Sequence, residues 1–201
     1  MATKKQPSEA HPKDGLPIAT FEDESAWSAF LEREHASSKG LWVKLAKKGA
    51  GARSITYAEA LEHALIWGWI DGQKGALDDA WWLQRFGPRR RRSIWSKINR
   101  EKASALIEAG RMQAAGLAEV ERAKADGRWD SAYDPPSRAQ VTPELAAALE
   151  AAPAAKAFFA MLDSANRYAV LHRVSTAKKP ETRDARIAKL VAMLARGEKL
   201  H

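Results

Sequence analysis

Hydrophobic positions in the first third of the chain follow helical and strand patterns in turn. Residues Ser25–His35 carry an apolar stripe at helical spacing, and the aromatic and β-branched run Leu41–Leu45 is typical of a strand. Thr56–Glu59 matches a capping box, in which a hydroxyl and a glutamate three residues later satisfy two backbone N–H groups. The helix that it opens extends toward Trp67, and Gly68 ends or bends it.

The next segment predicts a β-hairpin. Trp69–Lys74 and Trp81–Phe86 have the composition of strands, and Leu77–Asp79 supplies the turn between them. The pair Gly87-Pro88 ends the second strand, because proline cannot donate a hydrogen bond to a ladder. Ser93–Ser96 is interpreted as a further strand.

Helical spacing dominates the rest of the chain. A helix capped by Ser96 or Asn99 ends at Gly110, and the paired prolines Pro135 and Pro136 interrupt the helical pattern and indicate a linker. The further predicted helices are Ala114–Ala125, one opened by Thr142–Glu144, Ala154–Leu162, Asn166–Val174 and Pro180–Arg196.

These elements predict an α+β protein with two folded parts, for which a chain of 201 residues is long enough. The first part is a small antiparallel sheet packed with helices, and the second is a small all-helical domain. We expect a flexible N-terminal tail over residues 1–19, the α+β domain over 20–130, a proline-containing linker over 131–141 and the helical domain over 142–201.

The composition excludes several classes of protein. The chain contains no cysteine, which rules out disulfides and thiolate metal ligands and fits a reducing compartment. No apolar run reaches the roughly 18 residues that span a bilayer, and residues 1–15 lack the apolar core of a signal peptide. We therefore expect a cytoplasmic protein without membrane insertion.

Basic residues are concentrated in one segment. Between Gln84 and Lys102, eight basic residues stand against Glu101 alone, so this segment carries +7 of a net charge of +8. Such a segment attracts anions and repels cationic peptides, and we expect an anionic macromolecule as partner, either an acidic protein or nucleic acid. The candidate anion- or partner-binding residues are Arg85, Arg89, Arg90, Arg91, Arg92, Lys97, Trp81, Trp82 and Trp95.

The tryptophans of this segment admit two interpretations. In the first, arginines clamp phosphates or carboxylates while Trp81, Trp82 or Trp95 stacks on bases. In the second, alternate tryptophans face the core and the arginines cover the solvated side. Because Trp81 and Trp82 are adjacent, they must point to opposite faces of the strand. The run Arg89–Arg92 is then the candidate for an exposed anion-binding surface.

Asp71 is the carboxylate that stands out, because it follows the tryptophan-rich run that contains Trp67 and Trp69. It could pair with Arg85 or Arg89 across the hairpin and fix the strand edge. It could instead act as a general base if it were buried with a raised pKa, in a pocket with Trp67 and Trp69. Structural pairing is the simpler hypothesis.

Other catalytic motifs lack support in the sequence. Glu59 and His63 have the spacing of two metal ligands on one helical face, but no third ligand stands nearby. There is no Gly-x-Ser-x-Gly nucleophile elbow, and Gly49-Ala50-Gly51 does not continue as a phosphate-binding loop. We therefore predict no catalytic residue, no metal and no cofactor, which favours a protein that is not an enzyme.

Several runs match a known family: Ser54–Ala60, Trp67–Gly72, Arg85–Arg89, Ser93–Asn99, Gly110–Met112, Ala157–Phe159 and Lys178–Arg183. Over roughly residues 20–198 the chain resembles the YdeI/OmpD-associated family, labelled bacteriocin-protection proteins, although Gly87 stands where that family commonly carries a small hydroxyl residue. The resemblance implies a bacterial protein with an N-terminal domain related to the YjbR/CyaY-like and DUF1801 group and a helical C-terminal domain.

The resemblance also implies a role in resistance to bacteriocins and cationic antimicrobial peptides, partly through an outer-membrane porin, with no established catalytic residues. The predicted function is therefore that of a non-enzymatic binding protein in such resistance or in envelope stress. It would act through an anionic partner such as a porin or a regulator, because its basic segment repels cationic peptides. The alternatives are nucleic-acid binding by the same segment, and a small-molecule binder or enzyme with a pocket around Asp71.

Overall fold

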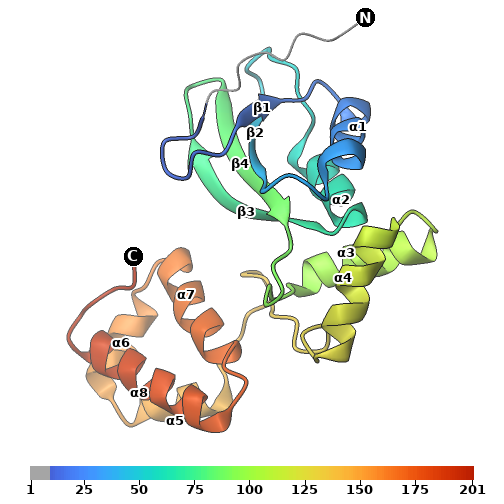
Figure 1. Ribbon diagram of the computed structural model, residues 1–201. Coiled ribbons are helices and arrows are strands. Elements are labelled where there is room, and N and C mark those ends of the chain that lie inside the picture. The colour runs from blue at the N-terminus through green and yellow to red at the C-terminus, as the bar shows by residue number, and fades with distance from the viewer. Residues whose placement is uncertain (1–9) are drawn as a thin grey trace, which may run out of the picture. The chain divides into compact units, whose positions relative to one another are not determined.

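The computed structural model describes residues 10–201, which form two compact units (Figure 1). Of these residues, the first unit contains 10–93 together with Glu101–Trp129, and the second contains Ile94–Arg100 together with Asp130–His201. Within residues 10–201 the structure has eight helices and one four-stranded sheet, and the C-terminal region is helical. The predicted α+β class is confirmed.

The sheet of the first unit is mixed. Its strands are β1 (Ile18–Thr20), β2 (Leu41–Ala46), β3 (Trp69–Ala76) and β4 (Trp81–Pro88), in the order β1-β2-β4-β3. Strands β3 and β4 form the predicted hairpin, with a register shift between Asp71 and Lys74. Because β1 runs parallel to β2, the sheet is not antiparallel throughout as expected.

Helices α1 (Glu24–Glu34) and α2 (Tyr57–Ile66) lie side by side on one face of this sheet (Figure 1). Trp27 of α1 has no exposed surface, and its ring centroid lies 6.2 Å from that of Trp69 and 5.6 Å from that of Phe86. Burial of each such ring stabilises the fold by roughly 1.5–3 kcal/mol. The aromatic residues of the hairpin therefore build the core between the helices and the sheet.

Helices α3 (Lys97–Glu108) and α4 (Ala114–Ala125) follow the hairpin. The side chain of Ser96 caps α3 by accepting a hydrogen bond from the backbone N–H of Asn99 (3.1 Å). The predicted strand Ser93–Ser96 is wrong. Its first residue ends a turn, and its last makes only one isolated parallel bridge to Tyr133, so no ladder partner holds the segment extended.

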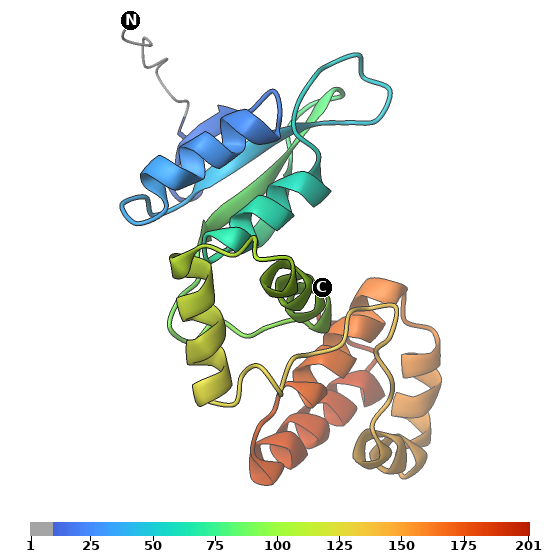
Figure 2. The ribbon, with the colours of Figure 1, turned by 90° about the vertical axis from the view of Figure 1, so that its right-hand side faces the viewer.

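Four helices make up most of the second unit (Figure 2), namely α5 (Pro143–Glu150), α6 (Pro153–Ala160), α7 (Ser164–Ser175) and α8 (Pro180–Ala195). Their core is built on α8, whose residues Ile187, Leu190 and Leu194 are buried at helical spacing. Thr142 caps α5 as predicted, and its hydroxyl accepts a hydrogen bond from the backbone N–H of Leu145. None of the helices within residues 10–201 is both long enough and apolar enough to cross a bilayer.

Two expected boundaries differ from the structure. Residues 10–19, expected to belong to a flexible tail, are folded: Ala10 bridges Pro17, and His11 stacks on Trp42 with ring centroids 4.0 Å apart. Residues 1–9 of that tail lie outside the described part of the chain. Segment Ile94–Arg100, expected in the first domain, belongs to the second unit, because Trp95 and Lys97 exchange backbone hydrogen bonds with Tyr133.

Candidate functional site

Three consecutive arginines, Arg90, Arg91 and Arg92, form an exposed arginine turn after β4. The turn is closed at both ends through Ser93. The backbone N–H of Arg90 donates to the Ser93 hydroxyl (3.0 Å), and the backbone N–H of Ser93 donates to the carbonyl of Arg90 (2.8 Å). The arrangement presents three guanidinium groups on a short, hydrogen-bonded piece of backbone.

Two buried arginines hold the arginine turn in place. Arg89 is only 5% exposed, and its backbone N–H donates to the carbonyl of Gly68 (3.1 Å). Arg128 is also 5% exposed, and it donates from Nη1 to the carbonyl of Ser93 (2.7 Å) while its Nε binds Asp126 (2.7 Å). The prediction of an exposed surface is therefore wrong for Arg89, whose side chain is enclosed by the fold.

The other predicted cations are paired with carboxylates. Arg85 contacts Asp14 (3.2 Å), and Lys97 contacts Asp134 (2.8 Å). Among residues 10–201 the side chains of the arginine turn make no ion pair. Their charge is therefore not neutralised by this part of the chain, and they are the predicted site residues best placed to bind an anion.

Trp81 and Trp82 point to opposite faces of the sheet, as their adjacency required. Trp82 lies beside Tyr57 of α2 and has the amino group of Lys74 over its ring, 4.3 Å from the centroid. Trp81 instead carries the amino group of Lys44 at 4.7 Å. Trp95 is 2% exposed, so the prediction that it contributes to a binding surface is wrong.

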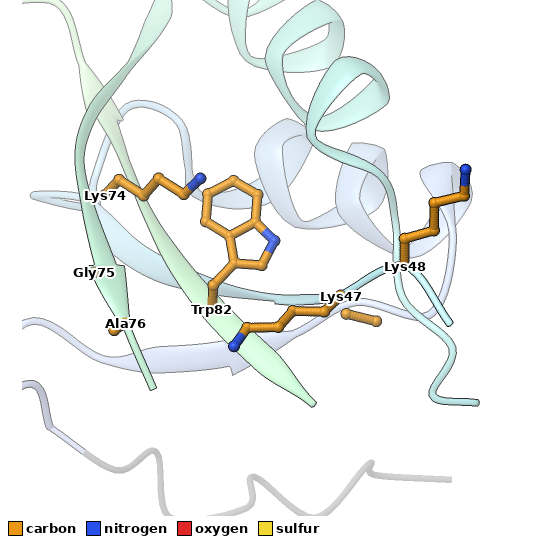
Figure 3. Close-up of a pocket in the computed structure, with 7 residues that line it drawn as sticks. Lys47, Lys48, Lys74, Gly75, Ala76 and Trp82 are labelled. Atoms are coloured by element: carbon orange, nitrogen blue, oxygen red, sulfur yellow. The ribbon is translucent and has the colours of Figure 1, made fainter. Parts of the chain in front are cut away.

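A second cationic feature lies at the other end of β4, as an open groove of about 530 Å³ (Figure 3). The lining residues are Ala46, Lys47, Lys48, Lys74, Gly75, Ala76 and Trp82. Figure 3 shows the Lys74 side chain directed toward Trp82, whereas Lys48 points away from it. Eight residues of β4, about 25 Å of extended chain, separate this lysine groove from the arginine turn.

The three residues of the predicted pocket have separate surroundings. Trp69 is 1% exposed and donates from Nε1 to the carbonyl of His35 (3.0 Å), while the ring of Trp67 lies against that of His35. Asp71 accepts a hydrogen bond from the hydroxyl of Tyr57 (2.9 Å), which connects α2 to β3. The expected partner Arg85 is the one that pairs with Asp14.

Two protein families match different parts of the chain. Residues 19–119 match a family described as a domain of unknown function, DUF8412, which covers half of the chain. The chain belongs to the DUF8412 family. Residues 138–197 match the family described as bacteriocin-protection, YdeI or OmpD-associated. No curated protein and no solved structure matches the chain.

The DUF8412 match corrects the expected resemblance for the first unit. The N-terminal domain is a DUF8412 domain, and not one of the YjbR/CyaY-like or DUF1801 group. The expected bacteriocin-protection family is supported over residues 138–197, in the helical region. Most of the motifs that carried the resemblance, from Ser54 to Met112, thus lie in the DUF8412 part of the chain.

Asp14 is the residue of the DUF8412 protein's first unit that sequence reasoning missed most clearly. Burial raises its pKa, but hydrogen bonds from Trp42 and the backbone of Leu16, together with the charge of Arg85, outweigh burial and lower the pKa overall. The sequence around Asp14 has the composition of a polar tail. In the structure it is folded, and the ring of His11 stacks on Trp42. Lys47, Lys48 and Lys74 were missed because only folding brings Lys74 to the same groove as the other two.

The residues with metal-ligand spacing have other roles in the DUF8412 domain. Glu59 completes the capping box with Thr56, because its carboxylate accepts a hydrogen bond from the backbone N–H of Thr56 (2.8 Å). Hydrogen bonds with the backbone and side chain of Thr56 lower the pKa of Glu59. Nε2 of His63 lies 3.2 Å from a carboxylate oxygen of Glu24. Residues 10–201 contain no group of three or more histidines and acidic side chains placed to hold a metal ion.

Proposed function

We propose that this protein is a non-enzymatic binding protein of the cytoplasm that contributes to protection against bacteriocins or cationic antimicrobial peptides by binding an acidic protein. The arginine turn is the contact site. The observation that carries the proposal is that Arg90, Arg91 and Arg92 are all exposed on hydrogen-bonded backbone and have no carboxylate partner within residues 10–201. The match of residues 138–197 to the bacteriocin-protection family supports the biological setting.

Charge complementarity selects the partner. Planar guanidinium groups bind carboxylates through two parallel hydrogen bonds, so three neighbouring arginines suit a cluster of aspartates or glutamates. A cationic peptide is repelled by the same three charges. Protection therefore acts through an acidic target, such as a porin or a regulator, and not through capture of the peptide itself.

The aromatic side chains favour a protein partner over nucleic acid. Binding of single strands depends on aromatic faces that are free to stack on bases. Lys44 covers one face of Trp81, Lys74 covers one face of Trp82, and Trp95 is buried. Trp81 and Trp82 lie at the start of β4, remote from the arginine turn, and Trp95 is enclosed by the fold, so none of these rings can stack on a base bound at the turn.

The test measures binding of the full chain to a fluorescent oligoglutamate peptide by anisotropy at low salt. Replacement of Arg90, Arg91 and Arg92 by glutamine should weaken binding at least about tenfold, if each lost contact contributes about 0.5 kcal/mol. The matched control replaces Lys47, Lys48 and Lys74 by glutamine. It removes the same charge from the same unit, and should weaken binding by no more than about threefold.

Three results would contradict the proposal. Equal losses in the two triple variants would mean that only the net charge attracts the peptide. Tighter binding of a single-stranded oligonucleotide of equal charge would favour the nucleic-acid alternative. Tight binding of a cationic peptide at low salt would overturn the argument from charge.

A cellular experiment tests the biological part separately. The wild-type protein, expressed in a bacterium that a bacteriocin kills, should raise the concentration needed for killing. The arginine-turn variant should lose this protection, whereas the lysine-groove variant keeps it. If the arginine-turn variant protects as well as the wild type, protection does not depend on anion binding at the turn.

A further inference from the structure

A second groove lies in the helical unit, where the end of α7 meets the middle of α8. Its volume is about 440 Å³, within the range of small-molecule sites. The lining residues are His172, Arg173, Thr176, Arg186, Lys189, Leu190, Met193 and Leu200, and none of them is acidic. We call it the α7–α8 groove.

Three cations on this groove lack carboxylate partners. Arg173, Arg186 and Lys189 make no ion pair within residues 10–201. Other cations of the same unit are paired with glutamates: Lys156 with Glu150, Arg183 with Glu144 and Arg196 with Glu198. The contrast indicates that the charge at the groove is available to an anion from outside this part of the chain.

The C-terminus of α7 lies at the same place and its dipole would oppose an anion, but its carbonyls are already occupied. Nη1 of Arg186 donates to the carbonyl of Arg173 (2.7 Å), and the hydroxyl of Thr176 donates to the carbonyl of His172 (2.6 Å). The end of a helix carries about half a negative charge, which three full positive charges exceed.

The other side of the groove is apolar. Leu190, 4% exposed, belongs to the core of the helical unit, and Met193 and Leu200 are partly buried against that core. Arg186, Lys189 and Met193 stand three and four residues apart on α8, so they share one face of the helix. Two cationic side chains and an apolar one thus lie in sequence along the same face of α8.

We propose that the α7–α8 groove binds an amphipathic anion, a carboxylate or phosphate headgroup on a short alkyl chain. The headgroup pairs with Arg173, Arg186 and Lys189, where charge-assisted hydrogen bonds are available. The chain lies along Leu190, Met193 and Leu200, where each buried methylene adds to the affinity. Free fatty acids and the headgroups of single-chain phospholipids both carry this chemistry.

The test uses the full protein with ¹³C-labelled methionine methyl groups, because Met193 lines the groove and reports on it directly. Octanoate should shift the Met193 methyl resonance in a saturable way, with a dissociation constant of about 1 mM or lower. Met112 of the first unit and Met161, which follows α6, is 72% exposed and does not line the groove, should not follow the same curve. A parallel titration with octyl phosphate distinguishes the two sources. Tighter binding of octanoate points to a fatty acid, and tighter binding of octyl phosphate points to a phospholipid headgroup.

Two further ligands separate the parts of the proposal. Octanol lacks the charge and acetate lacks the chain, so each should bind at least about tenfold more weakly than octanoate. Octanol that binds as tightly as octanoate would overturn the cationic site. A Met193 resonance that does not move with octanoate or octyl phosphate, or that moves in step with Met112 and Met161, would overturn the groove as a binding site.

A pair of variants tests the role of the headgroup contacts. Lys189→Gln should raise the dissociation constant of octanoate about threefold to fivefold, as expected for an ion pair with an exposed lysine. Lys178→Gln removes the same charge from an exposed position of the same unit outside the groove, and should leave the constant unchanged. Equal effects of the two substitutions would mean that the net charge, and not the groove, attracts the anion.

Discussion

Gly116 lies at the contact between α4 and the end of α2, where the chain leaves no room for a side chain. A Cβ atom at this position would collide with the carbonyl of Ile66, and it would lie 2.7 Å from the Met112 methyl group and 2.9 Å from the carbonyl of Leu65. Two of these three atoms belong to backbone, which cannot move aside without shifting α2.

Gly116→Ala should therefore destabilise the first unit. Overpacking of this kind costs about 1–3 kcal/mol, against a gain of about 1 kcal/mol from the higher helix propensity of alanine. Urea unfolding followed by tryptophan fluorescence measures the change. Gly72→Ala is the control, since its Cβ would meet only the Arg85 side chain at ordinary contact distance (3.6 Å). A Gly116→Ala protein more stable than the wild type would refute the close contact.

Two effects lower the pKa of His172. Burial disfavours the charged ring, and the positive charge of Arg186 disfavours it further, so the pKa of His172 is lowered from 6.5. Tyr133 and Tyr168 pack against the ring, with centroids 4.7 and 5.6 Å away, and burial raises the pKa of Tyr168 to about 12. Tyr168 therefore stays neutral while the histidine titrates.

The depressed pKa of His172 makes the stability of the helical unit dependent on pH. Because the unfolded chain binds more protons than the folded chain, the free energy of unfolding should fall as the pH drops through 6.5. Titration of the imidazole by NMR should give a midpoint below 6.5, and Arg186→Gln should raise that midpoint. A midpoint at or above 6.5 in the wild-type protein would contradict both causes.

At the scale of elements, α2 depends on a complete capping box. The hydroxyl of Thr56 accepts from the backbone N–H of Glu59 (3.3 Å), and the Glu59 carboxylate accepts from the backbone N–H of Thr56 (2.8 Å). Thr56→Ala should lower the free energy of unfolding by about 1 kcal/mol, measured by urea unfolding. Thr56→Ser keeps the hydroxyl and should stay within a few tenths of a kcal/mol of the wild type. An equal loss in both variants would assign the effect to the methyl group.

The helices could be predicted from the sequence because their start and stop signals are local. Residues Ala114–Ala125 form a helix with the predicted bounds, and the capping residues Thr56 and Thr142 act as expected. Strands depend on partners far along the chain. Strand β1 forms because Ile18 meets Trp42, and Ser93–Ser96 fails to form one because it meets no neighbouring strand. The local sequence pattern shows neither the pairing of the first segment nor the lack of a partner for the second.

The basic character of the candidate site could be predicted from the sequence, but the residues that are exposed in it could not. The basic run was visible from its composition, yet Arg89 and Arg90 look alike in sequence and differ in exposure. The difference arises because the backbone of Arg89 continues the contact with Gly68, whereas Arg90 begins the turn. The α7–α8 groove combines residues from Arg173 to Leu200 that carry no sequence motif, so only the packing of the helices reveals it.

At the scale of the whole molecule, each compact unit has a core of its own. Leu65 is buried in the first unit, and Leu194 is buried in the second, with 1% and no exposed surface respectively. Seven of the eight tryptophans lie in the first unit, and Trp95 alone lies in the second. Tryptophan fluorescence therefore follows mainly the first unit, while far-ultraviolet circular dichroism also follows the helices of the second.

These two probes should separate the unfolding of the units, because independent cores need not unfold in one transition. Leu194→Ala should cost about 2–5 kcal/mol in the second unit, and it should shift the circular dichroism transition in urea while the fluorescence transition stays in place. Leu65→Ala should cost a similar amount in the first unit and shift the fluorescence transition. If either substitution moves both transitions equally, the two units unfold as one cooperative body. If each moves its own, the anion sites of the two units can be altered one at a time without loss of the other.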